Sequence, residues 1–162
     1  MQNSASHVGT GTYRERLGPS LWTVLAAAVV SPMAALVFVA INPTVALAIG
    51  AFVAVGVIGA MIAFAPVVSV TDHTLRAGRA HIDVAFTGEP VIARGEDARH
   101  ARGPGLDHRS WHLIRGGIEP VVIIPIIDPD DPAPAWVISS RTPERLAAAL
   151  RRSHITQRTP RR

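Results

Sequence analysis

The longest pattern in this chain is apolar: residues 17–71 carry no charged side chain. Two hydrophobic runs, at residues 21–41 and 44–65, are separated by Asn42-Pro43. A bilayer core requires about 20 apolar residues in helical form, and each run has that length. Proline begins a helix more easily than it continues one. The pattern therefore predicts a transmembrane α-helical hairpin, with helix 1 at 21–41 and helix 2 at 44–65.

Small residues recur at four-residue intervals in both predicted spans. They include Ala27, Ser31 and Ala35 in the first span, and the candidate helix-packing residues Gly50, Ala54, Gly56 and Gly59 in the second. In lipid, small residues let helices approach closely. These faces pack the hairpin against itself, or against a second copy or a partner helix. Pro32 is expected to kink the first span.

After Pro66 the pattern changes to short runs typical of β-strands. Strands are predicted at 67–71, 80–86, 91–92, 110–114, 119–127 and 135–139, with a turn at 75–78 and no helix among them. Pro125 is expected to mark an edge strand or a bulge. Thr142, Pro143 and Glu144 suit an N-cap, a first helical position and an acidic first turn. A helix is therefore predicted at 143–152.

Many antiparallel strands followed by one amphipathic helix indicate a small bent sheet or barrel that the helix closes. The fold class predicted is a membrane protein, with the transmembrane hairpin followed by a small β-rich domain. Pleckstrin-homology-like domains have this order of elements, which is an analogy of fold only.

Charge gives the predicted hairpin an orientation. Arg14 and Arg16 precede the first span and Arg76 and Arg79 follow the second, while the loop between the spans is uncharged. Positively charged flanks stay in the cytoplasm, so both termini are expected there, in a multi-pass protein of the inner (plasma) membrane. A cleaved signal peptide is the alternative for the first run, but the second span would still keep the C-terminal part inside.

The expected organisation is a cytoplasmic segment at 1–20, the hairpin, a cytoplasmic β-rich domain at 67–152 and a basic tail at 153–162. All 16 positive residues are arginine. From residue 141 onward there are seven arginines and only one acidic residue, Glu144. A basic tail is attracted to anionic head groups, or serves as a frayed, solubilising end.

Few residues suggest chemistry. The chain has no cysteine, which excludes a disulfide framework and Cys-based zinc sites. Asp128, Asp130 and Asp131 fit a turn better than a cation site, because no EF-hand glycine or distal glutamate accompanies them. His108 and His112 have a metal-ligand spacing for a helix, but the glycines around them favour a solvated loop. No metal or cofactor is predicted.

Four residues are candidates for binding a partner: Trp136, Arg141, Arg109 and Trp111. A tryptophan beside an arginine can hold an anion or a peptide. Core packing is the alternative for Trp136. The segment 94–117, rich in arginine and histidine, is a solvated loop in the simplest interpretation. Contact with an anionic lipid or a phosphate, or with a metal, are the alternatives for it.

Two stretches resemble one known family. They are Tyr13-Arg14-Glu15-Arg16-Leu17 and the run Asp128-Pro129-Asp130-Asp131-Pro132-Ala133-Pro134-Ala135-Trp136 with Ser139-Ser140-Arg141-Thr142-Pro143 after it. Both are similar to a family of short, alanine-rich actinobacterial membrane proteins known only as a domain of unknown function. The resemblance extends from Tyr13 to about Leu150. It implies a membrane location and an actinobacterial source, and no activity.

The sequence carries no nucleophile elbow, no His-Glu-x-x-His and no clear acid pair, so an enzyme is not expected. Its basic tail lacks the aromatic residues of a nucleic-acid surface. We therefore expect a membrane-anchored interaction or scaffold module, with membrane lipids and an unknown membrane or cytoplasmic protein as partners and a homo-oligomer as an option. The alternative is an accessory subunit of a transporter or envelope-synthesis complex that acts through its hairpin. A membrane-bound enzyme using the histidine-rich segment is a third, weaker option.

Overall fold

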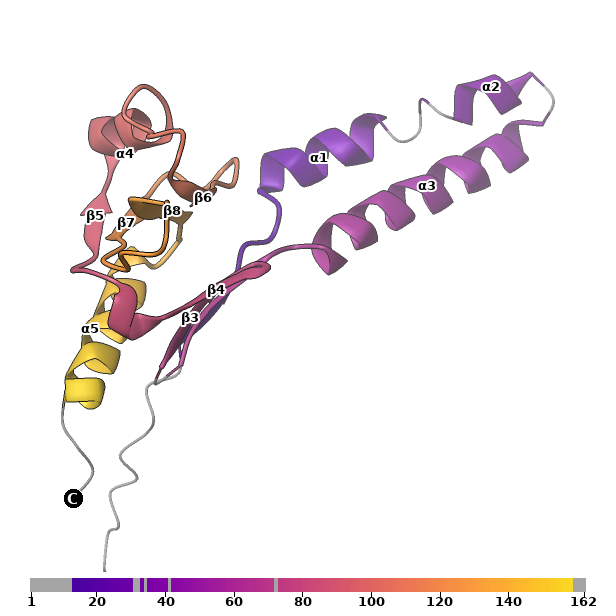
Figure 1. Cartoon of the computed structure of the whole chain (residues 1–162). Helices are drawn as coiled ribbons and strands as arrows, with labels where there is room; N and C mark the ends of the chain where they lie inside the picture. The colour runs from indigo at the N-terminus through magenta and orange to yellow at the C-terminus, as the bar shows by residue number, and fades with distance from the viewer. Residues whose placement is uncertain (1–12, 31–32, 34, 41, 72, 159–162) are drawn as a thin grey trace, which may run out of the picture. The chain divides into compact units, whose positions relative to one another are not determined.

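The structure, a computed structural model, describes residues 13–30, 33, 35–40, 42–71 and 73–158. The chain divides into two compact units (Figure 1). The helical unit comprises Arg16–Pro66 and Arg115–Ile118. The β-rich unit comprises Val67–Ile114 and the described parts of Met1–Glu15 and Glu119–Arg162.

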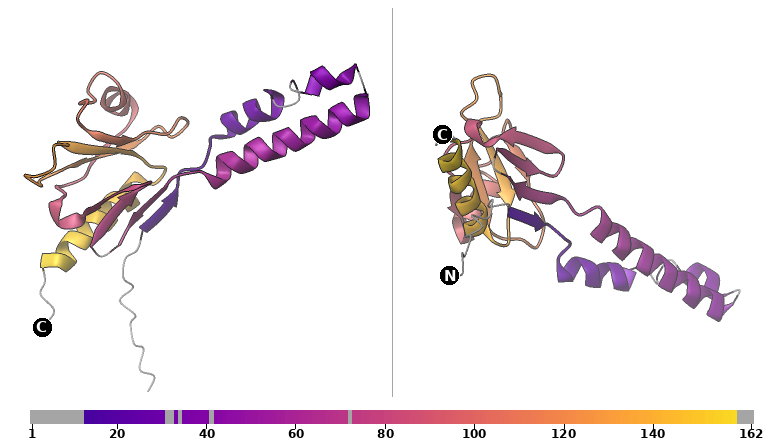
Figure 2. Two further views of the ribbon diagram at one scale, coloured as in Figure 1. Left: turned by 45° about the vertical axis from the view of Figure 1, so that its right-hand side comes forward. Right: turned by 90° about the horizontal axis from the view of Figure 1, so that it is seen from below.

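The described residues of the helical unit include the α-helices α1 (Leu21–Val30), α2 (Leu36–Val39) and α3 (Pro43–Ala63), and both α1 and α2 contact α3 (Figure 2). The start of α3 is where the sequence predicts it. Asn42 Oδ1 accepts hydrogen bonds from the backbone N–H groups of Thr44 (2.9 Å) and Val45 (3.2 Å), and Pro43 stands at the first position. This cap satisfies donors that have no partner inside the helix.

A cation caps the other end of α3. The Arg16 guanidinium donates hydrogen bonds to the carbonyl oxygens of Ile62 (2.8 Å) and Ala63 (2.9 Å). Terminal carbonyls lack partners within the helix, and the helix dipole favours a positive charge at this end. Leu17 N–H also donates to the Pro66 carbonyl oxygen at 2.9 Å. The chain that enters α1 is thereby tied to the chain that leaves α3.

The first predicted span, at 21–41, is not one continuous helix among the described residues. α1 has 10 residues and α2 has 4. The predicted kink at Pro32 and the packing position Ser31 lie outside the described residues, as do residues 34 and 41. A proline nitrogen cannot donate to the helix ladder, so hydrophobicity alone does not make this run a single helix. In the described ranges, only α3, with 21 residues and a mean hydropathy of 2.6, is long and apolar enough to cross a bilayer.

The first sheet of the β-rich unit has the strand order β1-β2-β3-β4. Its strands are β1 (Tyr13–Arg16), β2 (Val67–Val70), β3 (Thr74–Ala77) and β4 (Ala80–Asp83). The pairs β2–β3 and β3–β4 are antiparallel. Side chains alternate between faces, since Leu75 is fully buried and Arg76 next to it is exposed. Gly78, with φ of 62°, turns β3 into β4 in a conformation that glycine adopts without strain.

The second sheet has the order β5-β7-β8-β6. Its strands are β5 (Val91–Ala93), β6 (Trp111–Leu113), β7 (Val121–Pro125) and β8 (Ala135–Ser139). β7 pairs antiparallel with β5 and β8, whereas β6 pairs with β8 in parallel. The expectation of purely antiparallel strands is therefore wrong for β6 and β8. The chain reverses direction at β7 and again at β8, which leaves β6 and β8 pointing the same way.

Three helices complete this unit: a short 3-10 helix η2 (Val84–Phe86), α4 (Gly95–Arg102) and α5 (Pro143–Arg158). α5 contacts β2, β5 and β7, so one helix packs on strands of both sheets (Figure 2). Leu146 and Leu150, on the predicted apolar stripe, are fully buried. A smaller cluster joins α4 to the second sheet through Ala98, Ala101, Ala93, Val121 and Val137. The β-rich composition with a C-terminal helix agrees with the sequence-based expectation.

A helix, α4, lies where the sequence pattern predicts only loop. Its charges follow the helix dipole, with Glu96 and Asp97 in the first turn and arginine and histidine in the last. Only Ala98 and Ala101 are buried, which is too little apolar surface to produce the stripe by which helices are recognised.

Other boundaries also differ from expectation. β3 is a strand at residues that are expected to form a turn. The prediction misses it because four residues around Arg76 are too few to show a clear alternation of polar and apolar side chains. β1 occupies part of the segment 1–20, which the sequence pattern marks only as a membrane flank. α5 continues to Arg158, beyond the predicted end at 152, since no helix breaker precedes Pro160. The tail predicted at 153–162 is thus helical to Arg158, and residues 159–162 lie outside the described residues.

One carboxylate joins β1 to the junction between β8 and α5. Glu15 accepts hydrogen bonds from the Tyr13 hydroxyl (2.5 Å), the Ser140 hydroxyl (2.6 Å) and the Arg141 backbone N–H (2.7 Å). The Thr142 hydroxyl lies 3.0 Å from the Tyr13 hydroxyl. These five residues are named the Glu15 latch. Burial, followed by the hydrogen bond to Glu15, raises the pKa of Tyr13 above its usual 10.0.

Replacing Glu15→Ala is expected to lower the free energy of unfolding by about 2–3 kcal/mol, because fully buried Ser140 loses its acceptor. Urea unfolding of the detergent-solubilised chain, followed by tryptophan fluorescence, measures this loss. Arg14→Ala, on the exposed side of the same strand, is the control and should change stability by less than about 0.5 kcal/mol. Equal losses in the two variants would contradict a specific role for the latch.

Tyr13 is the only tyrosine, so tyrosinate absorbance reports on the latch alone. The native chain should titrate above pH 10.0 and the urea-unfolded chain near it. Because the folded pKa is raised, its contribution to stability is complete below pH 10.0 and disappears as the pH rises through the folded pKa. Tyr13→Phe should remove the part of the loss of stability at alkaline pH that is due to ionisation of Tyr13. A native midpoint at or below the unfolded one would refute this environment for Tyr13.

Candidate functional site

Two of the four predicted partner-binding residues pack against each other. Trp111 on β6 and Trp136 on β8 lie opposite one another in the parallel register, with ring centroids 4.6 Å apart and planes tilted by 38°. This spacing is within the range in which aromatic rings attract. Trp136 is only 5% exposed, whereas Trp111 is half-buried. The structure therefore places Trp136 in the core, and Trp111 has the more accessible ring.

The other two residues are exposed and engaged locally. Arg141 contributes its backbone N–H to the Glu15 latch. The Arg109 guanidinium lies 3.5 Å from a carboxylate oxygen of Asp107, and the Arg109 backbone N–H donates to the other oxygen at 2.8 Å. An arginine with a carboxylate beside it is less available to an anionic ligand.

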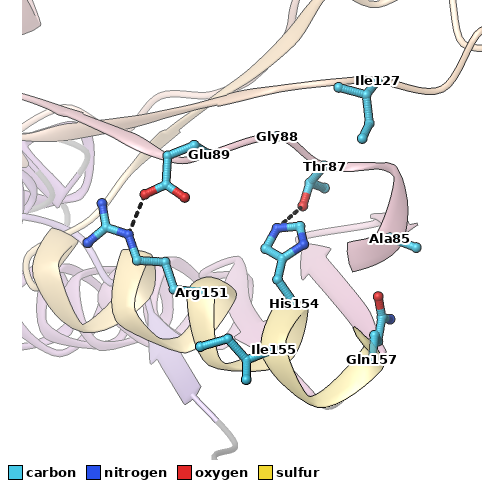
Figure 3. A pocket seen from close by; sticks show the side chains of 9 residues that line it. All are labelled: Ala85, Thr87, Gly88, Glu89, Ile127, Arg151, His154, Ile155 and Gln157. Carbon is cyan, nitrogen blue, oxygen red and sulfur yellow. Dashed lines mark hydrogen bonds and ion pairs between the residues drawn. The ribbon is translucent and has the colours of Figure 1, made fainter. Parts of the chain in front are cut away.

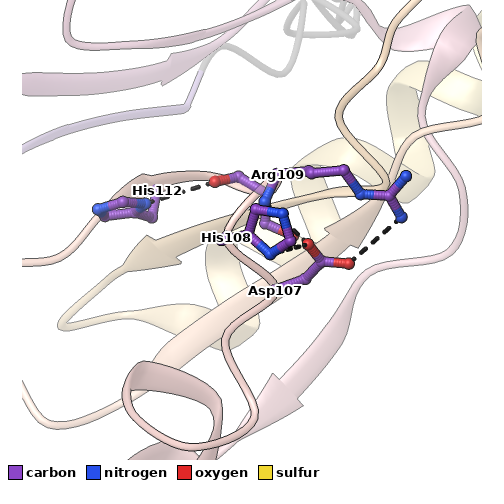
Figure 4. A network of polar contacts seen from close by, with 5 residues as sticks. Asp107, His108, Arg109 and His112 are labelled. Atoms are coloured by element: carbon purple, nitrogen blue, oxygen red, sulfur yellow. Dashed lines mark hydrogen bonds and ion pairs between the residues drawn. The ribbon is translucent and has the colours of Figure 1, made fainter.

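Asp107 contacts His108 and Arg109, and His112 lies in the same network of polar contacts (Figure 4). The backbone N–H of Arg109 is the main cause that lowers the pKa of Asp107. His108 Nδ1 lies 3.6 Å from this carboxylate, while His112 Nδ1 lies 3.4 Å from the Ser110 carbonyl oxygen. Within the described residues, no three His, Cys, Asp or Glu side chains are placed to hold a metal ion.

The aspartate-rich stretch forms turns. Asp128 Oδ1 accepts a hydrogen bond from the Asp130 backbone N–H at 3.0 Å, and Asp131 Oδ1 accepts one from Ala133 at 2.8 Å. Such side chain-to-backbone bonds two residues ahead are ordinary turn chemistry for aspartate. This geometry supports the turn interpretation over a cation site.

The candidate helix-packing residues fall into two groups. Gly50 is buried and Ala54 half-buried, and both line an apolar groove of about 390 Å³ with Ala35 and other residues of α2 and α3. Gly56 and Gly59 are exposed, and apart from their chain neighbours and the backbone of α3 no described heavy atom lies within 4 Å of where a Cβ would stand on either. The first group thus packs helices within this unit, and the second leaves a flat, open surface.

The sequence interpretation missed a concavity of the β-rich unit that α5 helps to form. This α5 groove has a volume of about 660 Å³ and lies between α5 and the segment after η2 (Figure 3). Its lining residues are Ala85, Thr87, Gly88, Glu89, Ile127, Arg151, His154, Ile155 and Gln157. Of the residues from α5, His154, Ile155 and Gln157 lie beyond the predicted helix end at 152, which explains why the pattern did not reveal this wall.

Polar contacts order the walls of the groove. The Arg151 Nε donates to Glu89 Oε1 at 2.5 Å, and His154 Nε2 lies 3.2 Å from the Thr87 hydroxyl oxygen (Figure 3). The Thr87 hydroxyl itself donates to the Val84 carbonyl oxygen at 2.8 Å. A hydroxyl has one proton to donate, so His154 donates to Thr87 and is not placed to deprotonate it. The pair holds the helix against the segment after η2 instead of forming a nucleophile and base.

The end of α5 is fixed at the same wall. Gln157 Nε2 donates to Asp83 Oδ1 at 2.9 Å. The pKa of Asp83 is lowered, chiefly by the backbone N–H of Ala85 and also by Gln157. Ile127 and Ile155 are 61% and 65% exposed and give the groove apolar edges. A charge pair beside apolar edges suits a polypeptide segment better than a small reactive substrate.

Residues 12–150 match the model of a family described as "Protein of unknown function (DUF3093)". No curated protein and no solved structure matches the chain. The family match covers the Glu15 latch and the strands, while the groove residues from Arg151 to Gln157 lie beyond it. Without a structural relative, the pleckstrin-homology-like analogy stays a prediction.

Proposed function

This chain belongs to the DUF3093 family, whose function is unknown, and we propose that it is a membrane-anchored interaction module. The observation that carries the anchor is α3, whose apolar side chains are largely exposed. Leu47 is 76% exposed, Phe52 81% and Val55 73%. A contiguous apolar surface of this kind is unusual on a soluble monomer and suits lipid.

The dimensions of α3 support the same proposal. Its 21 residues extend over about 31 Å at 1.5 Å per residue, close to the roughly 30 Å of a bilayer core. Only 11% of the most apolar stretch of α3 is buried, whereas the core helix of a soluble domain is mostly buried. Inner-membrane insertion of the whole hairpin, with both termini cytoplasmic, is the finer form of this proposal. The argument for orientation remains the arginines on either side of the uncharged run. An actinobacterial source likewise stays a prediction.

The α5 groove is the proposed contact surface for a partner protein. Its apolar edges, Ile127 and Ile155, can take an apolar side chain, and the exposed pair Glu89–Arg151 can exchange partners with a charged residue. Exposed ion pairs contribute only about 0–1 kcal/mol to stability, so this exchange costs the fold little. Anchoring restricts the groove to the membrane surface, which raises its effective concentration for partners there.

The hairpin itself is the second candidate contact. Gly56 and Gly59 present a small-residue surface that no described atom covers, and close helix packing in lipid uses such surfaces. This favours an accessory subunit of a transporter or envelope-synthesis complex as the alternative function. No activity is proposed for either form.

The anchor is tested with the double variant Leu47→Arg, Val55→Arg. Each arginine within a lipid-embedded helix costs about 2.5–3.5 kcal/mol, so the variant should leave the membrane on alkaline extraction while the parent chain floats with lipid. Val91→Arg, an exposed position on β5, is the control and should float with the parent. Extraction of the parent chain, or retention of the double variant, would contradict the anchor.

In-cell crosslinking of the full-length chain decides which of the two surfaces binds the partner. The pair Ile127→Asp, Ile155→Asp should remove at least about 90% of the captured partner if the groove binds it, since a charge is placed in each apolar edge. Gly56→Leu, Gly59→Leu should then have no effect. Arg152→Gln, exposed on α5 but outside the groove lining, is the matched control.

The reverse pattern, with capture lost only in the glycine variants, would favour the alternative function, an accessory subunit that binds through its hairpin. Equal capture by all variants would refute both surfaces. Thermal unfolding of each variant distinguishes a lost surface from a lost fold.

A further inference from the structure

We propose that the outer face of the first sheet binds a phosphate-type anion through Ser69, Arg76 and His81. This sheet-face site is separate from the α5 groove, shares no residue with it and does not rest on the proposed function. Its three residues come from three neighbouring strands, β2, β3 and β4.

The strand register brings these residues into one row. Ser69 is paired with Arg76, and Arg76 with His81. Directly opposite residues of antiparallel strands have Cβ atoms about 4.5–5.5 Å apart on the same face. Arg76 and His81 are exposed, while their strand neighbours Leu75 and Ile82 point into the core. Packing of the opposite, buried face of the sheet therefore fixes the backbone positions of the three residues in the row.

The lining of the site has the chemistry of an anion site. A concavity of about 260 Å³ is lined by Ser69, Thr71, Thr74, Arg76 and His81. These side chains offer a guanidinium, an imidazole and three hydroxyls, and no carboxylate is among them. A guanidinium matches two oxygens of a phosphate group, and the hydroxyls of Ser69 and Thr74 can donate to the others, whereas the Thr71 hydroxyl already donates to the Thr74 carbonyl oxygen (3.2 Å). Since one water occupies about 30 Å³, the concavity has room for a phosphate group with several waters.

Some exposed arginines among the described residues of the β-rich unit pair with a carboxylate, and Arg76 is not one of them. Arg94 pairs with Glu144, and Arg151 with Glu89. Among the described residues, no carboxylate pairs with Arg76 or His81.

Asp83 is the nearest acidic residue in the register, because it stands opposite Thr74. Its Oδ1 accepts hydrogen bonds from the Ala85 backbone N–H (2.8 Å) and from Gln157 (2.9 Å), and it does not line the concavity. The Arg76 guanidinium and its two row neighbours are thus left for an external anion.

Two sources can supply such an anion: a soluble phosphate compound and the head group of an anionic phospholipid. Ser69 follows the end of α3 at Ala63 by six residues, and a chain of that length spans at most about 20 Å. If α3 crosses a bilayer, a lipid head group is therefore within reach of the chain. The two sources share one recognition chemistry and are separated by experiment.

The full-length chain in phosphatidylcholine nanodiscs is titrated with inorganic phosphate against sodium chloride of equal ionic strength. The imidazole proton resonance of His81, assigned from His81→Gln, reports binding. A saturable shift is expected with phosphate and not with chloride. Arg76→Gln should weaken binding about tenfold or more, because a charge-assisted, two-oxygen contact is lost.

Arg79→Gln is the matched control, since it removes the same charge from the same β3–β4 hairpin at an exposed residue outside the lining. It should change affinity less than about twofold, as expected for a distant, screened charge. Ser69→Ala is a second site variant that retains Arg76 and His81. Tryptophan fluorescence, to which Trp22 contributes as well as the Trp111–Trp136 pair, checks that every variant is folded.

A second titration replaces part of the phosphatidylcholine with phosphatidylglycerol and omits phosphate. A His81 shift that appears only in this arm, and is lost in Arg76→Gln but not in Arg79→Gln, assigns the site to lipid head groups. A shift with phosphate alone assigns it to soluble phosphate compounds. No saturable shift in either arm, or equal weakening by Arg76→Gln and Arg79→Gln, overturns the proposal.

Discussion

The carboxylate of Glu15 is the contact on which the arrangement of the β-rich unit depends. It receives hydrogen bonds from the Tyr13 and Ser140 hydroxyls and from the Arg141 backbone, groups from segments about 125 residues apart in the chain. Ser140 is fully buried, so its hydroxyl needs an acceptor to offset the loss of water. The latch closes the first sheet at β1 and fixes the residue before α5 in one step. The two segments on which the family resemblance rests thus meet in space at this carboxylate.

α5 transmits that constraint to the rest of the unit. Its buried leucines pack on strands of both sheets, and its last turns form one wall of the α5 groove. The hydrogen bonds from His154 to Thr87 and from Gln157 to Asp83 hold this wall against the residues on either side of η2. A surface carried by a helix that is fixed at both ends is preorganised, which lowers the entropic cost of binding a partner. The groove therefore derives its shape from the same core that stabilises the domain.

The two units divide the physical tasks of the protein. Residues 17–66 contain no ionisable side chain, so the helical unit offers apolar surface and small-residue packing but almost no polar chemistry. The β-rich unit carries the cations and carboxylates, and four of its described arginines pair with acidic residues. Among the described residues no carboxylate pairs with Arg76, and the register of a regular antiparallel sheet places a hydroxyl and an imidazole beside it. Regular pairing, and not a loop, is what brings these three groups together.

Local pattern alone determined much of this protein. The Asn42-Pro43 start of α3, the strands near 91, 121 and 135, and the Thr142-Pro143 start of α5 follow from periodicity and capping, which act between near neighbours. Long-range contacts decided the remainder. Burial of Trp136 against Trp111, the parallel β6–β8 pair and the three-strand row at Arg76 depend on register, which no local pattern encodes. β1 and α4 contain too few apolar residues to be recognised from the sequence pattern. They are stabilised by contacts with other segments of the chain, which the local pattern does not record. For the same reason the α5 groove could emerge only from the folded arrangement of its walls.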